Sequence, residues 1–169
     1  TTPEESGERQ PLTLEGMPFT IVLDGRLDNR EELCRALTIE PARAGALSDA
    51  ALCLHAYARW GEACVEHLLG DFAFVIHDPQ QQALFCARDA LGERTLFYAR
   101  QGNGWIIASE PWAVVGGLAD GAGIDEITVA HYFAVRSAPD GRTFFKEVRE
   151  LQPANAMDLP AAGEPRIGR

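Results

Sequence analysis

The side chains that could carry chemistry in this sequence are four cysteines, four histidines and two short polar motifs. The cysteines are widely spaced, and no two of them form a C-x-x-C pair: Cys34, Cys53, Cys64 and Cys86. Each lies within an apolar pattern, which favours buried, reduced thiols and therefore a cytoplasmic protein. The histidines show no metal-ligand spacing, and neither an H-E-x-x-H motif nor a phosphate-binding glycine loop occurs. We therefore expect no metal site.

The two polar motifs are Asp24-Gly25-Arg26 and Ser48-Asp49. The first follows a short β-rich run, so its plain interpretation is a surface turn in which Arg26 is solvated. The second begins a predicted helix, where serine caps the helix and Asp49 favours the positive end of the helix dipole. Both motifs also have a functional interpretation, which depends on the elements around them.

These motifs must be positioned by a sheet, which we place in the stretch from Gly70 to Glu110. The stretch contains four apolar runs, each closed by a turn signal: residues 72–77, 83–88, 96–99 and 105–108. Short runs at this spacing predict an antiparallel meander. Both faces of the first run are largely apolar, so we expect the sheet to be covered on two sides, with Phe72 and Phe74 in one layer. Arg88-Asp89 is expected to fix the end of a strand through an ion pair or a turn bond.

The rest of the chain is expected to pack around this sheet. Helical spacing and start signals, among them Asn29 as a cap, predict five helical segments: residues 29–37, 48–60, 62–69, 111–115 and 125–135. We expect a loop at 41–47 and short edge strands at 143–148 and 154–159. Residues 1–10 are polar and do not look like the natural start of a compact domain.

The bulk properties limit the classes of function. A chain of 169 residues suits one domain with a sizeable core. Its net charge of −10 argues against a nucleic-acid or anionic-membrane partner, because neutralising phosphates needs surplus Lys and Arg. No apolar run approaches the roughly 20 residues of a transmembrane helix. The polar, acidic first residues do not resemble a signal peptide.

Seven segments carry a resemblance to a known family: Asp24–Asn29, Ser48-Asp49, Tyr57–Gly61, Gly70–Phe74, Ala87–Gly92, Ala108–Glu110 and Leu151–Ala156. In order and spacing they resemble the asparagine synthetase branch of the class II glutamine amidotransferases. The resemblance implies an α+β fold of the amino-terminal-nucleophile (Ntn) hydrolase kind, with layered antiparallel β-sheets and helices packed on the outside. It assigns residues 1–159 to a glutamine amidotransferase type-2 domain and residues 160–169 to a linker toward a C-terminal synthetase domain.

Members of this family hydrolyse glutamine with an N-terminal cysteine, whose thiolate attacks the side-chain amide and whose α-amine is the base. None of the four cysteines is near the start of the sequence. The resemblance therefore implies a domain that lacks its N-terminal strands and carries no catalytic residue on this chain. Thr1 is an alternative nucleophile, since an N-terminal threonine with its own amine is a known arrangement. Against this, the residues after Thr1 lack the apolar strand that would hold it in a site.

The resemblance assigns substrate binding to Asp24, Gly25, Arg26 and Asp49. Asp24 and Arg26 stand where the family has an asparagine that donates to the oxyanion and a glutamate that pairs with the α-ammonium of glutamine. An ionised Asp24 cannot donate, and losing one such donor costs about 3–4 kcal/mol of transition-state stabilisation. Arg26 would repel the ammonium. Asp49 matches a family carboxylate that also contacts the amino group of glutamine.

Two functions follow from the resemblance. In the first, the chain is the glutaminase-type domain of an ATP-dependent, amide-forming ligase, and ATP and Mg²⁺ are expected only on the synthetase domain. In the second, it is a vestigial scaffold in a synthetase that closes an amide with its substrate's own amine, as β-lactam synthetases and lasso-peptide cyclases do. Asp24 and Arg26 favour the second. The expected partners are glutamine and the synthetase domain; a homodimer and the identity of the acyl substrate stay open.

Overall fold

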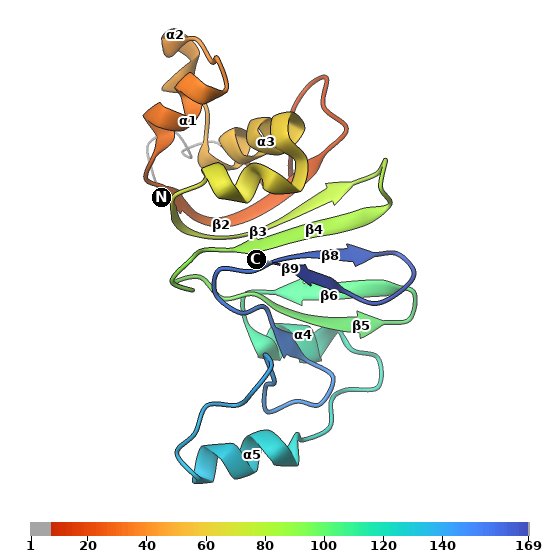
Figure 1. Ribbon diagram of the computed structural model, residues 1–169. Coiled ribbons are helices and arrows are strands. Elements are labelled where there is room, and N and C mark those ends of the chain that lie inside the picture. The colour runs from red at the N-terminus through yellow and green to blue at the C-terminus, as the bar shows by residue number, and fades with distance from the viewer. Residues whose placement is uncertain (1–7, 169) are drawn as a thin grey trace.

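The computed structural model describes residues 8–168 and contains two antiparallel β-sheets (Figure 1). The larger sheet has the strand order β1-β2-β3-β4-β8-β9, and the smaller has the order β6-β5-β7. The strands are β1 (Leu12–Thr13), β2 (Thr20–Leu27), β3 (Gly70–Asp78), β4 (Ala83–Arg88), β5 (Phe97–Gln101), β6 (Gly104–Ala108), β7 (Arg149–Glu150), β8 (Ala156–Pro160) and β9 (Arg166–Gly168). The helices are α1 (Arg30–Ala36), α2 (Pro41–Ala44), α3 (Asp49–Trp60), the 3-10 helix η2 (Gly61–His67), α4 (Pro111–Gly117) and α5 (Glu126–Phe133).

Three apolar clusters hold these elements together as layers. The first lies between α3 and the larger sheet and includes Leu52 and Phe74. The second lies between the two sheets and joins Cys86 of the larger sheet to Tyr98 of the smaller. The third packs α4 on the smaller sheet through Val114. The order helix, sheet, sheet, helix, visible from top to bottom in Figure 1, confirms the predicted fold class.

Strand β3 lies within the larger sheet and contributes to both of its cores. Phe72 and Phe74 are buried on the side of α3, where their rings stack with centroids 5.7 Å apart. Ala73 and Val75 point to the opposite face and pack in the cluster between the sheets. This alternation follows from the two-residue period of a strand, and it confirms that both faces of the first apolar run are covered.

The four predicted runs do not form one meander. β3 and β4 belong to the larger sheet, whereas β5 and β6 form a hairpin in the smaller one. The chain crosses between the layers in the loop from Asp89 to Leu96. Turn signals mark where a strand ends, but they do not say whether the next strand pairs with it or begins a second layer.

The C-terminal part of the chain also differs from expectation. The predicted edge strand at 154–159 is β8, which lies between β4 and β9. β9 comes from the segment predicted to be a linker, so Arg166–Gly168 extends the larger sheet. The predicted strand at 143–148 is irregular; the pairing with β5 is made by β7 just after it. Short segments of this kind are assigned by their pairing partners, which local composition does not reveal.

Two local predictions in the N-terminal half are corrected. The expected loop at 41–47 begins with the short helix α2, whose first residue is a proline. Asn29 precedes α1 but makes no side-chain capping bond. Its amide group instead donates to the carbonyl of His67 and accepts from the N–H of Leu69, at 3.0 and 3.1 Å. Asn29 therefore ties the start of α1 to the approach to β3.

Replacing Phe74 by alanine should destabilise the domain strongly, because its side chain is only 1% exposed. We expect the free energy of unfolding, measured by urea denaturation, to fall by about 3–5 kcal/mol. Val22→Ala is the control, since Val22 is 48% exposed on β2 and should change it by less than about 1 kcal/mol. Equal effects of the two changes would contradict the assignment of Phe74 to the core.

Candidate functional site

The motif Asp24-Gly25-Arg26 lies inside strand β2, so the predicted surface turn is wrong. These residues pair in register with Ala73, Phe72 and Asp71 of β3, respectively. The Asp-Gly pair does not reverse the chain, because β3 continues the ladder as far as Leu27. A strand position fixes which way each side chain points. Asp24 and Arg26 share one face of β2, and the buried Leu23 and Leu27 occupy the face beneath α3.

Gly25 is required by the close approach of β2 and β3. Its φ is +145°, and a Cβ atom at this position would overlap the carbonyl oxygen of Asp71 and lie 2.6 Å from the Cα of Phe72. Gly70 on β3 has the matching constraint against the carbonyl of Arg26, with φ +152°. Glycine tolerates both the backbone conformation and the contact. A structural reason for Gly25 therefore stands beside the substrate-binding role that the resemblance assigns to it.

The exposed face of this strand end carries an alternating series of charges. Arg26 pairs with Asp28 at 3.0 Å and with Asp71 at 3.2 Å. The hydrogen bond to Asp28, followed by its charge and that of Asp71, raises the pKa of the Arg26 guanidinium. Asp24 pairs with Arg94 at 3.4 Å. Both motif side chains are thus neutralised by neighbours, which weakens the repulsion expected of an isolated Arg26.

Asp49 occupies a different environment from Asp24 and Arg26. Its side chain is fully buried, accepts a hydrogen bond from the N–H of Leu27 at 3.0 Å, and forms an ion pair with Arg30. Ser48 accepts from the N–H of Ala51 at 3.2 Å, which confirms it as the cap of α3. Asp49 therefore fixes the start of α3 against the end of β2. It has no exposed surface in this structure with which to meet a substrate.

Four charged partners of these motifs escaped the sequence analysis: Asp28, Arg30, Asp71 and Arg94. For two of them the sequence held a signal. Asp28 stands two residues after Arg26, so in a strand the two share a face. Asp71 belongs to the segment Gly70–Phe74, whose pairing opposite Arg26 follows once β2 and β3 are placed in register.

The loop after β4 positions Arg94 and is organised by Asp89. The Asp89 carboxylate is 1% exposed and accepts four backbone N–H groups, at 2.6–3.1 Å: those of Leu91, Gly92, Glu93 and Arg94. Burial would raise the pKa of Asp89, but these four donors together lower it. The prediction of a turn bond at Arg88-Asp89 is confirmed.

Arg88 links this loop to the smaller sheet. Its guanidinium is buried, pairs with Glu150 at 2.7 Å, and donates to the carbonyls of Leu151 and Gly92 at 2.6 and 2.8 Å. Its Nε donates to the carbonyl of Arg94. Arg88 therefore bonds to the loop and to β7 rather than to Asp89.

The four cysteines are free and buried, as predicted. Burial raises the pKa of Cys64 to about 12 and also raises that of Cys53 and Cys86. Such thiols are protonated near neutral pH and are poor nucleophiles. Thr1, the alternative nucleophile, lies outside the described residues. Within residues 8–168, no group of three or more His, Cys, Asp or Glu side chains could hold a metal ion, and no helix is long and apolar enough to cross a membrane.

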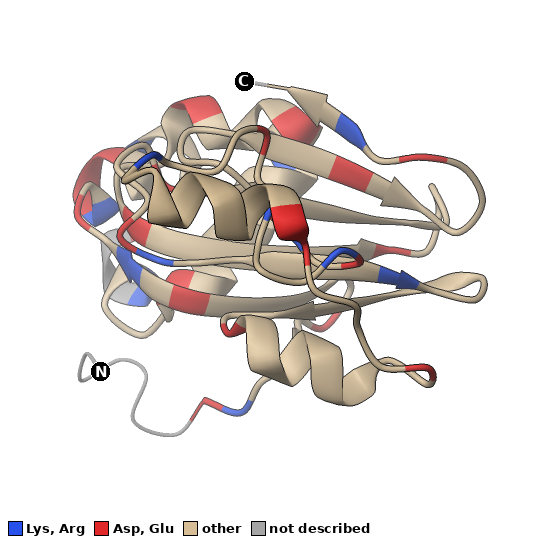
Figure 2. Ribbon diagram, turned by 90° about the horizontal axis from the view of Figure 1, so that it is seen from below, with Lys and Arg blue, Asp and Glu red and all other residues tan. Residues whose placement is uncertain are grey.

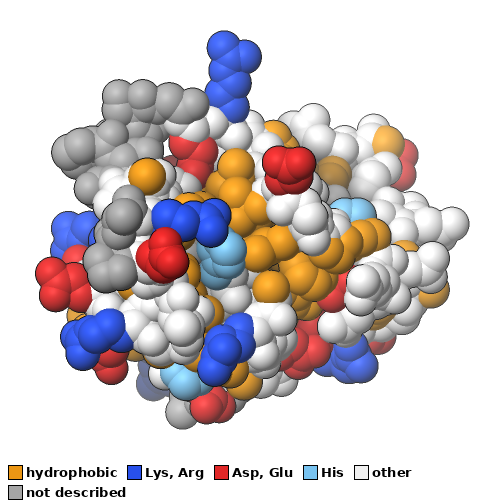
Figure 3. All heavy atoms as spheres, turned by 90° about the horizontal axis from the view of Figure 1, so that it is seen from above, with side chains coloured by type: hydrophobic (Ala, Val, Ile, Leu, Met, Phe, Trp, Pro, Cys, Tyr) orange, Lys and Arg blue, Asp and Glu red, His pale blue; other side chains and the backbone are white. Residues whose placement is uncertain are grey.

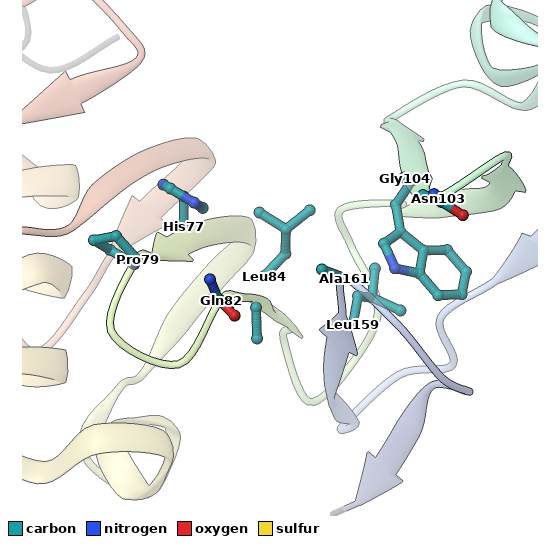
Figure 4. A pocket seen from close by; sticks show the side chains of 10 residues that line it. His77, Pro79, Gln82, Leu84, Asn103, Gly104, Leu159 and Ala161 are labelled. Carbon is teal, nitrogen blue, oxygen red and sulfur yellow. The ribbon is translucent and has the colours of Figure 1, made fainter.

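A pocket of about 430 Å³ lies at the other end of the sheets from the charged motif (Figure 4). It is lined by His77 near the end of β3, by Gln82 of the turn between β3 and β4, and by Trp105 of β6. The Trp105 indole donates to the carbonyl of Pro160 at 2.9 Å. The pocket and the motif lie at different positions along the paired strands β2 and β3: His77 pairs with Thr20, whereas Asp24 pairs with Ala73.

Comparison with known proteins identifies the class to which this fold and these motifs belong. Residues 3–166 match the model of the glutamine amidotransferase domain family. The fold is also similar to that of a glutamine phosphoribosylpyrophosphate amidotransferase from B. subtilis, with a TM-score of 0.61, 20% identity, and coverage of 95% of this chain and 31% of that one. This chain belongs to the glutamine amidotransferase domain family.

Among curated proteins, the chain is 34% identical over 160 residues to asparagine synthetase [glutamine-hydrolyzing] 3 of Bacillus subtilis. It is 31% identical over 139 residues to a putative asparagine synthetase [glutamine-hydrolyzing] of Mycobacterium tuberculosis. The matches cover 93% and 79% of this chain but only 26% and 21% of those proteins. The chain thus corresponds to about a quarter of the length of these relatives.

Replacing Asp89 by asparagine should lower the free energy of unfolding by about 2–4 kcal/mol at pH 7, because an amide oxygen replaces only part of four charge-assisted hydrogen bonds. The folded-state pKa of Asp89 is lowered. Its contribution is therefore complete above the ordinary pKa of about 4 and is lost as the pH falls through the folded value. Urea denaturation at pH 7 and pH 3 should show the difference shrinking at low pH. An undiminished difference at pH 3, or an equal loss in Asp120→Asn, would contradict this role.

Replacing Arg30 by methionine tests the internal role of Asp49. The change should cost about 3–5 kcal/mol, because it leaves a buried carboxylate with the Leu27 N–H as its remaining partner. Arg35→Met on the same helix is the matched control, since Arg35 is exposed and should contribute within about 0.5 kcal/mol. Adding Asp49→Asn to Arg30→Met should recover part of the loss. If thermal and urea unfolding show no difference between the Arg30 and Arg35 variants, the pair does not hold α3 in place.

Proposed function

We propose that the longer protein is an ATP-dependent, amide-forming ligase of the asparagine synthetase kind, in which this domain hydrolyses glutamine and supplies ammonia. The observation that carries the proposal is the similarity to the Bacillus subtilis asparagine synthetase over 93% of the chain. Glutamine would bind this domain, whereas ATP and Mg²⁺ would bind the remaining part of the protein. The acyl group that accepts the ammonia would be selected there as well.

Glutamine hydrolysis needs a nucleophile, donors to the oxyanion and a partner for the α-ammonium. The four cysteines of residues 8–168 are buried and therefore unsuited to be the nucleophile, so that group would come from outside the described residues. Asp49 is buried against Arg30 and cannot reach a substrate without rearrangement. Asp28 and Asp71 already hold a cation at the end of β2 and are partly exposed. We assign the α-ammonium to these two carboxylates, with displacement of Arg26.

A second candidate function is favoured by the charges of the motif itself. Asp24 places an acceptor where an oxyanion would need a donor. Arg26 occupies the carboxylates that a substrate ammonium would need. A silent scaffold would keep this closed set of ion pairs, in a synthetase that forms its amide with the substrate's own amine.

Assays of the longer protein test the first proposal. With aspartate as the probe acyl substrate, we expect ATP to be converted to AMP and pyrophosphate, and glutamine to support amide formation. Pyrophosphate release without glutamine hydrolysis, when free ammonium still supports amide formation, would select the scaffold function. If ATP is not cleaved to pyrophosphate with any amino-acid acyl donor, the ligase proposal fails.

The variant Asp24→Asn with Arg26→Glu discriminates further between the two functions. If the charges silence the site, restoring a donor and freeing the carboxylates should raise glutamine hydrolysis by about 10²-fold, and by more than either single change. Arg35→Glu on α1 makes the same charge change as Arg26→Glu alone and should leave the rate unaltered. A wild-type protein that already releases ammonia from glutamine as fast as the double variant would rule out a silenced pocket.

A further inference from the structure

Helix α5 presents its apolar side chains to solvent. Ile127, Tyr132 and Phe133 are 50%, 66% and 79% exposed, whereas Thr128 is 5% exposed. A helix on the surface of a globular protein normally does the opposite, with apolar residues inward and polar residues outward. The inverted pattern indicates that the exposed side of α5 is covered by something other than the described residues.

The same feature continues onto the neighbouring segments. Trp112 of α4 is 70% exposed, and Ile124 and Phe144 on either side of α5 are 66% and 45% exposed. The rings lie against each other at their edges: Tyr132 packs on Phe144 with centroids 5.6 Å apart, and Trp112 packs on Phe145 at 4.8 Å. We call the six residues Trp112, Ile124, Ile127, Tyr132, Phe133 and Phe144 the α4–α5 apolar face. Contiguous exposed apolar patches mark interaction sites.

The α4–α5 apolar face is nearly free of charge. Helices α4 and α5 carry one charged residue between them, Glu126, in a chain of which 24% is charged. Figure 2, which views the molecule from this side, shows both helices uncoloured apart from the acidic start of α5. Figure 3 shows the opposite side, where acidic and basic side chains surround the apolar atoms. The scarcity of charge on α4 and α5 is thus not shared by the opposite side of the molecule.

A groove of about 660 Å³ runs between α4 and α5 and offers a specific polar contact. Thr128 lines this groove, and its hydroxyl is buried without a hydrogen-bond partner among the described residues. A buried hydroxyl left unpaired is unfavourable, and a hydrogen-bonding group from a bound partner would remove that cost. Arg136 borders the same groove, as do Arg142 and Glu150, which form ion pairs with Asp125 and Arg88. The matching surface is therefore apolar, with a hydrogen-bonding group opposite Thr128 and an acidic group opposite Arg136.

We propose that the α4–α5 apolar face docks a second domain of the same polypeptide. This rests on the proposed function, since it takes the longer ligase as the source of that domain. The chain matches only 26% of the length of the Bacillus subtilis asparagine synthetase, so that relative carries almost three times as much further polypeptide. Tethering keeps a second domain at high effective concentration. A second copy of this chain is a poorer occupant, because two chains with a net charge of −10 each repel one another.

Hydroxyl-radical footprinting of the full-length protein tests the docking. Leu91 is the internal control, because its 80% exposure matches the 79% of Phe133 and it lies outside the α4–α5 apolar face. After correction for intrinsic reactivity, we expect Trp112, Tyr132 and Phe133 to be oxidised about tenfold more slowly than Leu91, because the core of a docked interface excludes water. In full-length Phe133→Arg, oxidation of Trp112 and Tyr132 should rise toward the Leu91 rate. In the control variant Leu91→Arg, oxidation of Trp112 and Tyr132 should stay slow.

Oxidation of the three residues at the Leu91 rate in the full-length protein overturns the proposal. Protection that disappears on dilution, with sedimentation showing a dimer that dissociates, also overturns it, because the occupant is then a second copy. Pyrophosphate release with an acyl substrate is measured on the same preparation and reports on the ligase function alone. Protection of the three residues without ligase activity refutes the proposed function and supports the docking surface. Ligase activity without protection supports the proposed function and refutes the docking surface.

Discussion

The arrangement of the layers depends on the bonds made by the buried guanidinium of Arg88. It sits at the end of β4, in the larger sheet, and bonds to Glu150 and Leu151 at the smaller one. The same group donates to carbonyls of the loop that carries the chain from one sheet to the other. A buried cation is tolerated only where its donors are satisfied, so sheet packing and loop conformation constrain each other. The Asp89 carboxylate accepts hydrogen bonds from four backbone N–H groups of that loop, one of them the N–H of Arg94. These bonds hold Arg94 beside Asp24.

The motif residues divide into an internal group and a surface group. Asp49 is buried between α3 and β2, where it pairs with Arg30. Asp24 and Arg26 instead lie on an exposed strand face among charges of both signs. A substrate could compete with exposed, solvent-screened ion pairs, which are individually worth little. It could not compete with a buried pair without disturbing the helix start. A ligand at this end of β2 would therefore bind at the surface, whereas Asp49 and Arg30 behind it hold the start of α3.

The sequence was sufficient for the fold class and the core but not for the sheet boundaries. Alternating apolar residues at Phe72 and Phe74 predicted a strand with two covered faces, because burial on both sides leaves a local signature. The split into two sheets, the interior position of β8 and the pairing of β9 depend on contacts between distant segments, which no local pattern records. At the candidate site, motif order singled out the candidate residues, yet the turn at Asp24-Gly25 was wrong because pairing with β3 overrides turn propensity. The partners Arg30 and Arg94 come from other elements and carried no signal of their own.

The opposed glycines of β2 and β3 have a consequence for how this domain can vary. Gly25 and Gly70 each face a carbonyl of the other strand at a separation that leaves no space for a methyl group. Glycine is therefore required at both positions as long as the two strands stay this close. The side chains beside Gly25 point to solvent and can change type or sign without disturbing the ladder. Substitutions at Asp24 and Arg26 could thus change the charge of this strand end during evolution while the pairing of β2 with β3 stays the same.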